Sequence, residues 1–471
     1  MQIGSLAKAT THFPMSIGSE FEGKNFLVIG AGVTGRALFD FITRHGYPVE
    51  IIDERDSTAK RDIPQGIDGE KTIAVVSPGW RLDHPLIEEL RRLRVHVLSE
   101  IDFAWKVKAT LAPHQKWIAL TGTNGKTTTI QMVESIFKAS GVNGVACGNV
   151  GRTVIESLEN GFDVLAIELS SFQLAWSDLP RFEAVALLNI AQDHIDWHGS
   201  FESYADAKMK LFYLSKLALV NISDATLAKS FQILKERAPH VKVMAFHLDT
   251  PGPGELGLVE EILVDRAFVP DQSEAIELSL ASDLSSDAPH NLLNSLAAAG
   301  LARALQIEPS AIATGLRGFS LDHHRLELIL DQDGIRWIDD SKATNPHAAL
   351  SALFSFDRII WIAGGLAKGA SMDELARAAH RRIEAVILIG TDASLIKEAM
   401  LREKPQLKIV ETDPGLRGKE LMRHVVTVAK ALASSGHTVL LAPACASMDQ
   451  FTSYAERGEA FSNAVRELVA S

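Results

Sequence analysis

A glycine-rich loop with a lysine and a threonine is the strongest chemical signal in the sequence. The segment Thr121-Gly-Thr-Asn-Gly-Lys-Thr-Thr-Thr129 follows an apolar run, Trp117–Leu120, and precedes a helical pattern, Ile130–Ser140. Glycines let backbone N–H groups turn inward onto phosphate oxygens, and the start of a helix adds a positive dipole. In such a loop the lysine reaches the terminal phosphates and the next hydroxyl ligates Mg²⁺, which assigns these roles to Lys126 and Thr127. A leucine stands where the longer pattern has its first glycine, so this is a shortened phosphate loop. The strand–loop–helix context favours it over a chance glycine turn.

A carboxylate follows about forty residues later, at the end of the apolar run Val164–Glu168. A strand end beside a phosphate loop is where an acid that holds Mg²⁺ belongs. The alternative is a surface glutamate at a strand terminus. The neighbouring loop favours the magnesium interpretation of Glu168.

A second glycine motif lies near the start of the chain. Gly30-Ala-Gly-Val-Thr-Gly35 follows the run Phe26–Ile29 and opens a helical pattern, Arg36–His45, and a later run, Val49–Ile52, ends in Asp53. This is the dinucleotide fingerprint, with the acid placed for a ribose hydroxyl. UDP offers the same pyrophosphate and ribose as NAD, so the motif predicts a diphosphate-and-ribose pocket, with close packing of the glycines as the alternative. The turn Ser77-Pro-Gly79 is expected to line the same crevice.

Three segments in the middle of the chain could have either a chemical or a purely structural role. Residues 188–200 contain two histidines and two aspartates after an apolar run, which suggests a metal or phosphate site. Zinc is not expected, because the spacing fits no structural zinc site and the chain has only two cysteines. Downstream, Tyr204–Phe212 has the pattern of an amphipathic helix, on which Lys208 and Lys210 would ordinarily be solvated. At the start of a later Ala/Leu-rich helix, Asn291 and Asn294 are open to either a capping or a base-binding role.

Three polar loops in the last third of the chain each follow an apolar run. They are Asp339–Pro346, Ala363–Gly369 and Ala442–Phe451. The carboxyl ends of parallel strands converge on a ligand, so these loops are expected to form one pocket. Their lysines and hydroxyls suit a small anionic substrate with carboxylates.

The elements that must position these residues alternate between short Val/Ile/Leu runs and helical patterns. Near-continuous apolar strands with helices between them predict parallel sheets covered on both faces, and therefore an α/β fold. A linker near Ala112-Pro-His-Gln115 and a polar stretch at Leu321–His324 divide the chain into three sections. We expect domains at residues 1–107, 108–320 and 321–471.

Composition limits the remaining classes. The chain has 471 residues, 46% hydrophobic and 23% charged, with a formal net charge of −12. This acidic balance argues against general nucleic-acid binding, and no apolar run reaches the roughly 18 residues that span a bilayer. Residues 1–20 lack the pattern of a signal peptide, and two cysteines are no disulfide framework. We expect a cytoplasmic monomer that binds neither nucleic acid nor a membrane.

These motifs together resemble the Mur ligases over nearly the whole chain, from about Gly23 to Phe461. The resemblance rests on the phosphate loop, Glu168-Leu-Ser-Ser-Phe-Gln173, Asp193-His-Ile-Asp196, His324-Arg-Leu-Glu327, Asp340-Ser-Lys-Ala-Thr-Asn345 and Pro443-Ala-Cys-Ala-Ser-Met-Asp-Gln-Phe451. It implies three domains in series: a Rossmann-like UDP-binding domain, a central P-loop ATPase-type domain and a Rossmann-like C-terminal domain that binds glutamate.

The resemblance also implies the residues of three binding sites and a metal centre. Those for ATP are Gly122, Thr123, Asn124, Gly125, Lys126, Thr127, Thr128, Asn291, Asn294, Arg325 and Asp340. Those for the UDP substrate are Val33, Thr34, Asp53, Arg55, Ser77, Gly79 and Asn149. Those for glutamate are Lys342, Thr344, Lys368, Ser447 and Tyr454, the last in place of the family's usual phenylalanine. Two Mg²⁺ would be held by Thr127, Glu168, His194 and Lys208, with Lys208 carbamylated by CO₂; Lys126, Glu168, His194 and Lys208 would be the catalytic group.

The implied reaction joins UDP-N-acetylmuramoyl-L-alanine to D-glutamate at the expense of ATP, through an acyl phosphate, in peptidoglycan precursor synthesis. The residues leave both enantiomers of glutamate open. Three other classes compete with this interpretation. A folylpolyglutamate synthase would not need the first glycine motif, an NAD-dependent oxidoreductase would not need the Lys126 loop, and a nucleotide switch or transport ATPase would leave the first section without a role.

Overall fold

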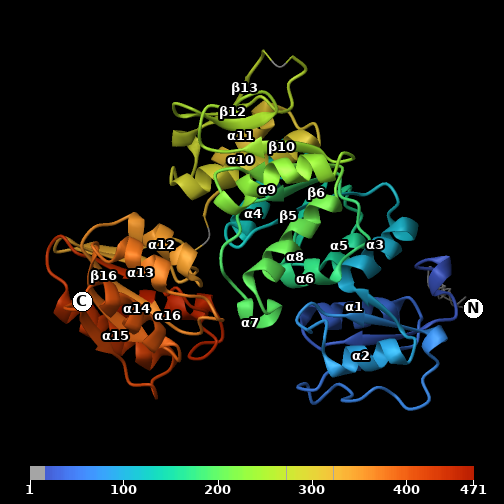
Figure 1. Ribbon diagram of the computed structural model, residues 1–471, viewed down its shortest axis with the longest axis horizontal. Helices are drawn as coiled ribbons and strands as arrows, with labels where there is room; N and C mark the ends of the chain where they lie inside the picture. Colours follow the sequence, from blue (N-terminus) through green and yellow to red (C-terminus); the bar gives the residue numbers. More distant parts are fainter. Residues whose placement is uncertain (1–15, 272, 322, 471) are drawn as a thin grey trace, which may run out of the picture. The chain divides into compact units, whose positions relative to one another are not determined.

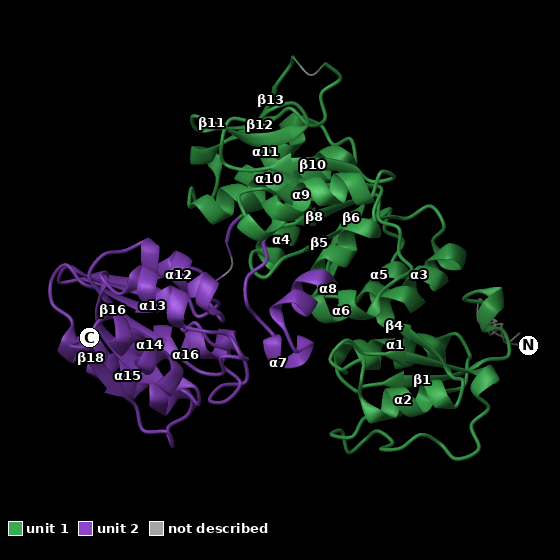
Figure 2. Ribbon diagram, in the orientation of Figure 1, with its two compact units in different colours: residues 1–188, 207–319 green, residues 189–206, 320–471 purple. Residues whose placement is uncertain are grey.

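The computed structural model describes residues 16–271, 273–321 and 323–470, and the chain forms two compact units (Figures 1 and 2). Unit 1 comprises residues 1–188 and 207–319, and unit 2 comprises residues 189–206 and 320–471. The expectation that no signal peptide is present rests largely on residues 1–15, which lie outside the described residues. No helix in the described part of the chain is long and apolar enough to cross a membrane.

The first sheet of unit 1 is parallel throughout, in the order β2-β1-β3-β4. Its strands are β1 (Asn25–Ile29), β2 (Val49–Ile52), β3 (Thr72–Val76) and β4 (His96–Ser99). Its helices are α1 (Val33–Arg44), α2 (Pro85–Arg92) and α3 (Glu100–Leu111). The apolar runs form these strands because both faces of the sheet are buried, as shown by the fully buried side chains of Val28 and Ile29.

The second sheet of unit 1 has the order β13-β12-β11-β10-β9-β8-β5-β7-β6. Its parallel strands are β5 (Lys116–Thr121), β6 (Gly144–Gly148), β7 (Val164–Glu168), β8 (Ala184–Leu187), β9 (Leu217–Asn221), β10 (Lys242–Phe246) and β11 (Glu255–Val259). Two antiparallel strands, β12 (Ile262–Asp265) and β13 (Ile276–Leu280), extend one edge. The helices are α4 (Lys126–Ser140), α5 (Val154–Leu158), α6 (Ser171–Trp176), α8 (Phe201–Tyr213), α9 (Ala225–Arg237), α10 (Pro289–Ala304) and α11 (Pro309–Arg317).

Unit 2 is built on a sheet in the order β14-β15-β19-β16-β17-β18, parallel except for β14. Its strands are β14 (Glu327–Gln332), β15 (Ile335–Asp339), β16 (Ile359–Gly364), β17 (Ile383–Ile389), β18 (Lys408–Glu411) and β19 (Thr438–Leu441). Its helices are α12 (Pro346–Phe354), α13 (Asp373–Ala379), α14 (Ala393–Glu403), α15 (Gly418–Leu432) and α16 (Tyr454–Leu468), together with the short α7 (Ile195–His198).

Alternation along the strands of unit 2 creates two cores. Successive strand side chains point to opposite faces of a sheet. Trp361 therefore packs with the residues of α12, α13 and α14, whereas Ile360 and Ile362 pack with those of α15 and α16. The sheet is thus covered on both faces, as the apolar runs predict.

The α/β class with parallel sheets in series is confirmed, and the differences from expectation lie at element ends. The helices α1 and α4 begin at Val33 and Lys126, a turn earlier than the apolar patterns indicate. Antiparallel strands at two sheet edges are an addition that the apolar runs do not predict. The domain boundaries at residues 107 and 320 stay a prediction.

Candidate active site

The phosphate loop lies between β5 and α4, and its lysine is folded onto it. Lys126 Nζ donates to the carbonyl oxygens of Gly122 at 2.8 Å and of Thr123 at 2.9 Å. Gly125, the residue before α4, has a left-handed φ of 83°. The early start of α4 places Lys126 and Thr127 in its first turn, and the N-terminal end of a helix favours the binding of an anion.

Helix α10 places Asn294, a residue predicted to bind the nucleotide, against the phosphate loop. A Cβ added to Gly125 would lie 2.4 Å from Asn294 Oδ1, so the glycine is required by the asparagine as well as by its φ. Asn291, one turn earlier on α10, is also buried. Asn291 does not cap the helix, because α10 begins at Pro289 with Ala288 as its N-cap residue.

Glu168 ends β7, next to β5 in the sheet, and its carboxylate is almost completely buried with an exposed fraction of 1%. Oε1 accepts a hydrogen bond of 3.0 Å from Asn149 Nδ2, whereas Oε2 has no hydrogen-bond partner among the residues that the structure describes. A buried carboxylate oxygen without a partner is costly unless a cation reaches it. Mg²⁺ prefers such oxygens and is ordinarily held by one or two carboxylates together with substrate phosphates. The donor set therefore fits Mg²⁺, with Asn149 orienting the ligand.

Lys208 does not have the solvated position that is ordinary for a lysine on an amphipathic helix. Its exposed fraction is 2%, and Nζ donates to Gly122 O at 2.8 Å and to Thr121 Oγ1 at 3.3 Å. Two lysines thus share the Gly122 carbonyl, and both cations lie at the phosphate loop. Lys210 does follow the expectation in part, since it forms an ion pair of 2.7 Å with the exposed Asp178.

His194 belongs to unit 2, where it precedes α7 with a left-handed φ of 53°. Its neighbour Asp193 accepts hydrogen bonds from the His194 backbone N–H at 2.9 Å and from Lys368 Nζ at 3.1 Å. The histidine-rich segment and the predicted glutamate lysine are therefore in contact through Asp193. Among the residues that the structure describes, no three His, Cys, Asp or Glu side chains are grouped so that they could hold a metal ion by themselves.

The first glycine motif forms the turn between β1 and α1. Asp53 accepts from the backbone N–H of Ala31 and of Arg55, both at 2.8 Å, and so fixes this turn against the end of β2. A Cβ on Gly35 would lie 1.7 Å from the Gly30 carbonyl oxygen, so close packing is part of the motif's role. Ser77 is brought to the same turn, 2.9 Å from a Cβ built on Gly30, and its buried hydroxyl oxygen has no partner in the described part of the chain. Val33 and Thr34 open α1, with Val33 77% exposed.

The three loops of unit 2 follow β15, β19 and β16, which are adjacent and parallel. Leu366 and Ala446 exchange backbone hydrogen bonds of 2.9 Å, and the Ala444 N–H donates to Ala343 O at 2.9 Å, so the loops are linked. Lys342 Nζ lies 5.3 Å from the centre of the Tyr454 ring. Two residues expected to bind glutamate are thus in cation–π contact. Ser447 lies buried in one of the linked loops, and the Thr344 N–H donates to Lys342 O at 2.9 Å.

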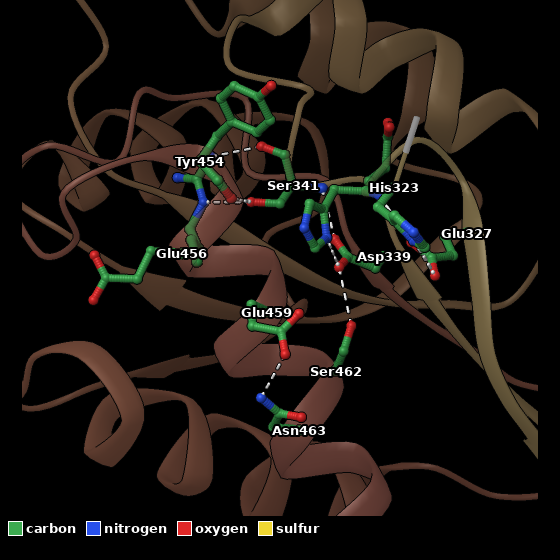
Figure 3. A network of polar contacts seen from close by, with 12 residues as sticks. His323, Glu327, Asp339, Ser341, Tyr454, Glu456, Glu459, Ser462 and Asn463 are labelled. Carbon is green, nitrogen blue, oxygen red and sulfur yellow. Dashed lines mark hydrogen bonds and ion pairs between the residues drawn. The ribbon is translucent and has the colours of Figure 1, made fainter. Parts of the chain in front are cut away.

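A polar network next to these loops joins the end of β15 to helix α16 (Figure 3). Asp339 is fully buried and accepts from Ser341 N at 2.9 Å, His324 Nδ1 at 2.7 Å and Ser462 Oγ at 3.2 Å. The hydrogen bond to Asp339 raises the pKa of His324. Burial raises the pKa of the Asp340 carboxyl to about 8, opposed by the Arg325 guanidinium and by the Leu326 N–H.

Sequence reasoning missed two buried members of this region. The sequence indicates Asp339 only as the first residue of a polar loop, although two adjacent acids at a strand end are a signal for a buried carboxylate. Arg457, with an exposed fraction of 0%, lies three residues after Tyr454 on α16 and carried no motif.

The fold is of the α/β class with parallel sheets, and the loop between β5 and α4 has the sequence and the helix start of a phosphate loop. The Mur ligase middle domain matches residues 120–302, and the Mur ligase glutamate ligase domain matches residues 324–445. The chain therefore belongs to the Mur ligase family. It is accordingly an ATP-dependent ligase of peptidoglycan precursor synthesis.

Relatives that carry a name are similar to this chain over nearly its full length. The chain is 43% identical to the UDP-N-acetylmuramoylalanine–D-glutamate ligase of Streptomyces coelicolor, covering 96% of this chain and 99% of the relative. It is 37% identical to the enzyme of that name from Mycolicibacterium smegmatis, covering 95% and 97%. Among solved structures, UDP-N-acetylmuramate-alanine ligase from Thermotoga maritima shares the fold with a TM-score of 0.56 at 18% identity, covering 94% of this chain and 99% of that one.

Proposed function

We propose that this chain joins UDP-N-acetylmuramoyl-L-alanine to D-glutamate in an amide bond, with ATP converted to ADP and phosphate. The proposal is supported most directly by two lysines that share the Gly122 carbonyl at the phosphate loop, beside a buried carboxylate with an unsatisfied oxygen. Lys126, and a cation bound to the unsatisfied oxygen of Glu168, would together hold several anionic oxygens at this loop. The naming of the full-length relatives supports the identity of the two joined substrates.

The proposed reaction has two steps. A carboxylate oxygen of the muramoyl-alanine attacks the γ-phosphorus of ATP, the bond to the bridging oxygen breaks, and ADP leaves. The free amine of glutamate then attacks the acyl carbon, loses a proton, and expels phosphate from the tetrahedral intermediate. No nucleophile of the protein takes part, since ATP activates the acid.

The residues of the chain have binding and orienting roles in this scheme. Lys126 exchanges its two carbonyl contacts for the γ-phosphate, Asn294 and Asn291 bind at the nucleotide, and Asn149 orients Glu168. Bound Mg²⁺ would neutralise the phosphate charge at Thr127 and Glu168 and, for a second ion, at His194 and Lys208. We infer that Lys208 reacts with CO₂ as a neutral amine to form a carbamate, which converts a cation into an oxygen ligand and releases its contacts with the loop.

The UDP moiety is assigned to the first sheet and the amino acid to unit 2. Asp53, Arg55, Ser77 and Gly79, with Val33 and Thr34, are proposed to bind the UDP part. Lys342, Thr344, Lys368, Ser447 and Tyr454 are proposed to bind the two carboxylates and the stem of glutamate. The protein is further proposed to act as a cytoplasmic monomer with domains at residues 1–107, 108–320 and 321–471.

The experiment that tests the function is phosphate release with ATP, Mg²⁺ and UDP-N-acetylmuramoyl-L-alanine while the amino acid is varied. Release is expected with D-glutamate, and only background release is expected with L-glutamate or with no amino acid. Equal release without any amino acid, or no release with either enantiomer, would contradict the proposal.

A further inference from the structure

Arg457 is a buried arginine that the reaction scheme does not use. It lies one turn into α16, the helix that begins with Tyr454, and none of its side chain is exposed. Arginine is almost never fully buried unless it is paired. Here its acidic neighbours, Asp449 and Asp339, act on it through space but form no ion pair with it in the described part of the chain. Something other than a salt bridge must account for its position.

The guanidinium instead forms a fork of hydrogen bonds, in which its nitrogens donate to two loops at once. Nε donates to Ser341 Oγ at 3.0 Å, Nη2 donates to Ser341 O at 2.8 Å, and Nη1 donates to Cys445 O at 3.1 Å. The Ser341 hydroxyl in turn donates to Tyr454 O at 2.7 Å, as Figure 3 shows. The planar shape of the guanidinium fixes all these directions at once, which a lysine ammonium does not do.

The anchored residues are direct neighbours of the proposed glutamate ligands. Ser341 precedes Lys342, and Cys445 stands two residues before Ser447. Tyr454, whose carbonyl the Ser341 hydroxyl holds, lies under the Lys342 ammonium. One side chain therefore connects the three segments that carry Lys342, Ser447 and Tyr454.

The nucleotide side of the same loop is held by other contacts. Asp340 N donates to Leu441 O at 2.8 Å, and Asp340 Oδ1 accepts from Leu326 N at 3.3 Å. Asp339 accepts from Ser341 N and is fixed in addition by His324 Nδ1 and Ser462 Oγ, with which Arg457 forms no hydrogen bond in the described part of the chain. A change at Arg457 should therefore disturb the amino-acid pocket more than the nucleotide pocket.

We propose that Arg457 is a positioning residue for amino-acid binding, which sets the relative placement of Lys342, Ser447 and Tyr454. The inference rests on the proposed function. Burial lowers the pKa of Arg457 to about 10, so the side chain stays positive at neutral pH.

The test is the substitution Arg457→Lys, which keeps the charge and removes the fork. We expect KM for D-glutamate to rise at least tenfold, while KM for ATP and for the UDP substrate changes less than twofold. The matched control is Arg466→Lys, an exposed arginine on the same helix, for which no constant should change. A purely structural role for Arg457 would lower the melting temperature and the amount of active enzyme without separating the three KM values, and that result would overturn the inference.

A second variant decides the matter if Arg457→Lys does not fold. Ser341→Ala removes one acceptor of the fork and the link to Tyr454, and should raise KM for D-glutamate at least threefold. An unchanged KM for D-glutamate in Ser341→Ala would then overturn the inference. The wild-type protein distinguishes a failure of the proposed function from a failure of the inference about Arg457. If the wild type releases no phosphate with D-glutamate, the proposed function is wrong. If the wild type is active and the variants have an unchanged KM for D-glutamate, only the role of Arg457 is contradicted.

Discussion

At the scale of one residue, Glu168 is a buried carboxylate that has one oxygen available for a ligand. One carboxylate oxygen is satisfied by Asn149 and the other has no partner among the described residues. We predict that Glu168→Gln lowers kcat at least about 100-fold, because a neutral amide is a poor magnesium ligand. Its melting temperature without Mg²⁺ should equal or exceed that of the wild type, since an unpaired buried charge has been removed. Calorimetry and a phosphate assay measure both effects.

The control for this prediction is Glu183→Gln, which alters an exposed pair with Lys216. This variant should keep its kcat. A stable Glu168→Gln protein with wild-type turnover would exclude Glu168 as a metal ligand.

Asp340 gives a pH dependence of stability with a definite sign. Its pKa of about 8 lies above the ordinary value of about 3.9, so the native state holds its proton longer than the unfolded chain does. The contribution of Asp340 to stability is complete below pH ~4 and is lost as the pH rises toward 8, by at most about 1.4 kcal/mol per pH unit.

Asp340→Asn should therefore gain stability relative to the wild type as the pH rises from 5 to 8. Urea denaturation at several pH values, without nucleotide, measures the difference. Asp333→Asn, at an exposed turn of unit 2, serves as control and should show no such trend. A difference between Asp340→Asn and the wild type that stays constant from pH 5 to 8 would contradict the shifted pKa.

At the scale of elements, helix α4 begins and ends with glycines in the left-handed region. Gly125 has a φ of 83° and Gly141 has a φ of 73°, but only Gly125 has a neighbour, Asn294, within 4 Å of an added Cβ. Alanine at either position costs about 1–2 kcal/mol for the backbone conformation. Gly125→Ala should be destabilised more than Gly141→Ala, because Asn294 and α10 must also move.

Denaturant titration of both glycine variants measures this difference. Adding Asn294→Ala to Gly125→Ala should recover the excess loss but not the backbone cost. Equal stability of the two single variants would mean that α10 does not press on the phosphate loop.

The same elements show which features a sequence reveals. Strands such as Val164–Glu168 and Thr438–Leu441 were predictable because a sheet buried on both faces requires an uninterrupted apolar run. The first turns of α1 and α4 were not, since polar residues such as Thr34 and Lys126 break the apolar period there. The helix pattern alone does not predict the burial of Lys208, because its acceptors, Thr121 and Gly122, lie more than 80 residues away in the sequence.

At the scale of the whole molecule, the chain divides its chemistry between two compact units. Unit 1 holds the phosphate loop, Glu168, Lys208 and the first glycine motif, and unit 2 holds His194 and the proposed glutamate ligands. Each unit contains a buried basic side chain close to its own loops, Lys208 in one and Arg457 in the other. The proposed reaction therefore needs three anionic substrates to be bound by one enzyme and to react through an acyl phosphate.

The most direct test of that claim is the fate of oxygen in the UDP substrate. UDP-N-acetylmuramoyl-L-alanine labelled with ¹⁸O in its terminal carboxylate is incubated with ATP, Mg²⁺ and D-glutamate, and the released phosphate is analysed by mass spectrometry. An acyl phosphate leaves one carboxylate oxygen on phosphorus, so we predict phosphate that carries one ¹⁸O per turnover. Amide product accompanied by unlabelled phosphate would contradict the account.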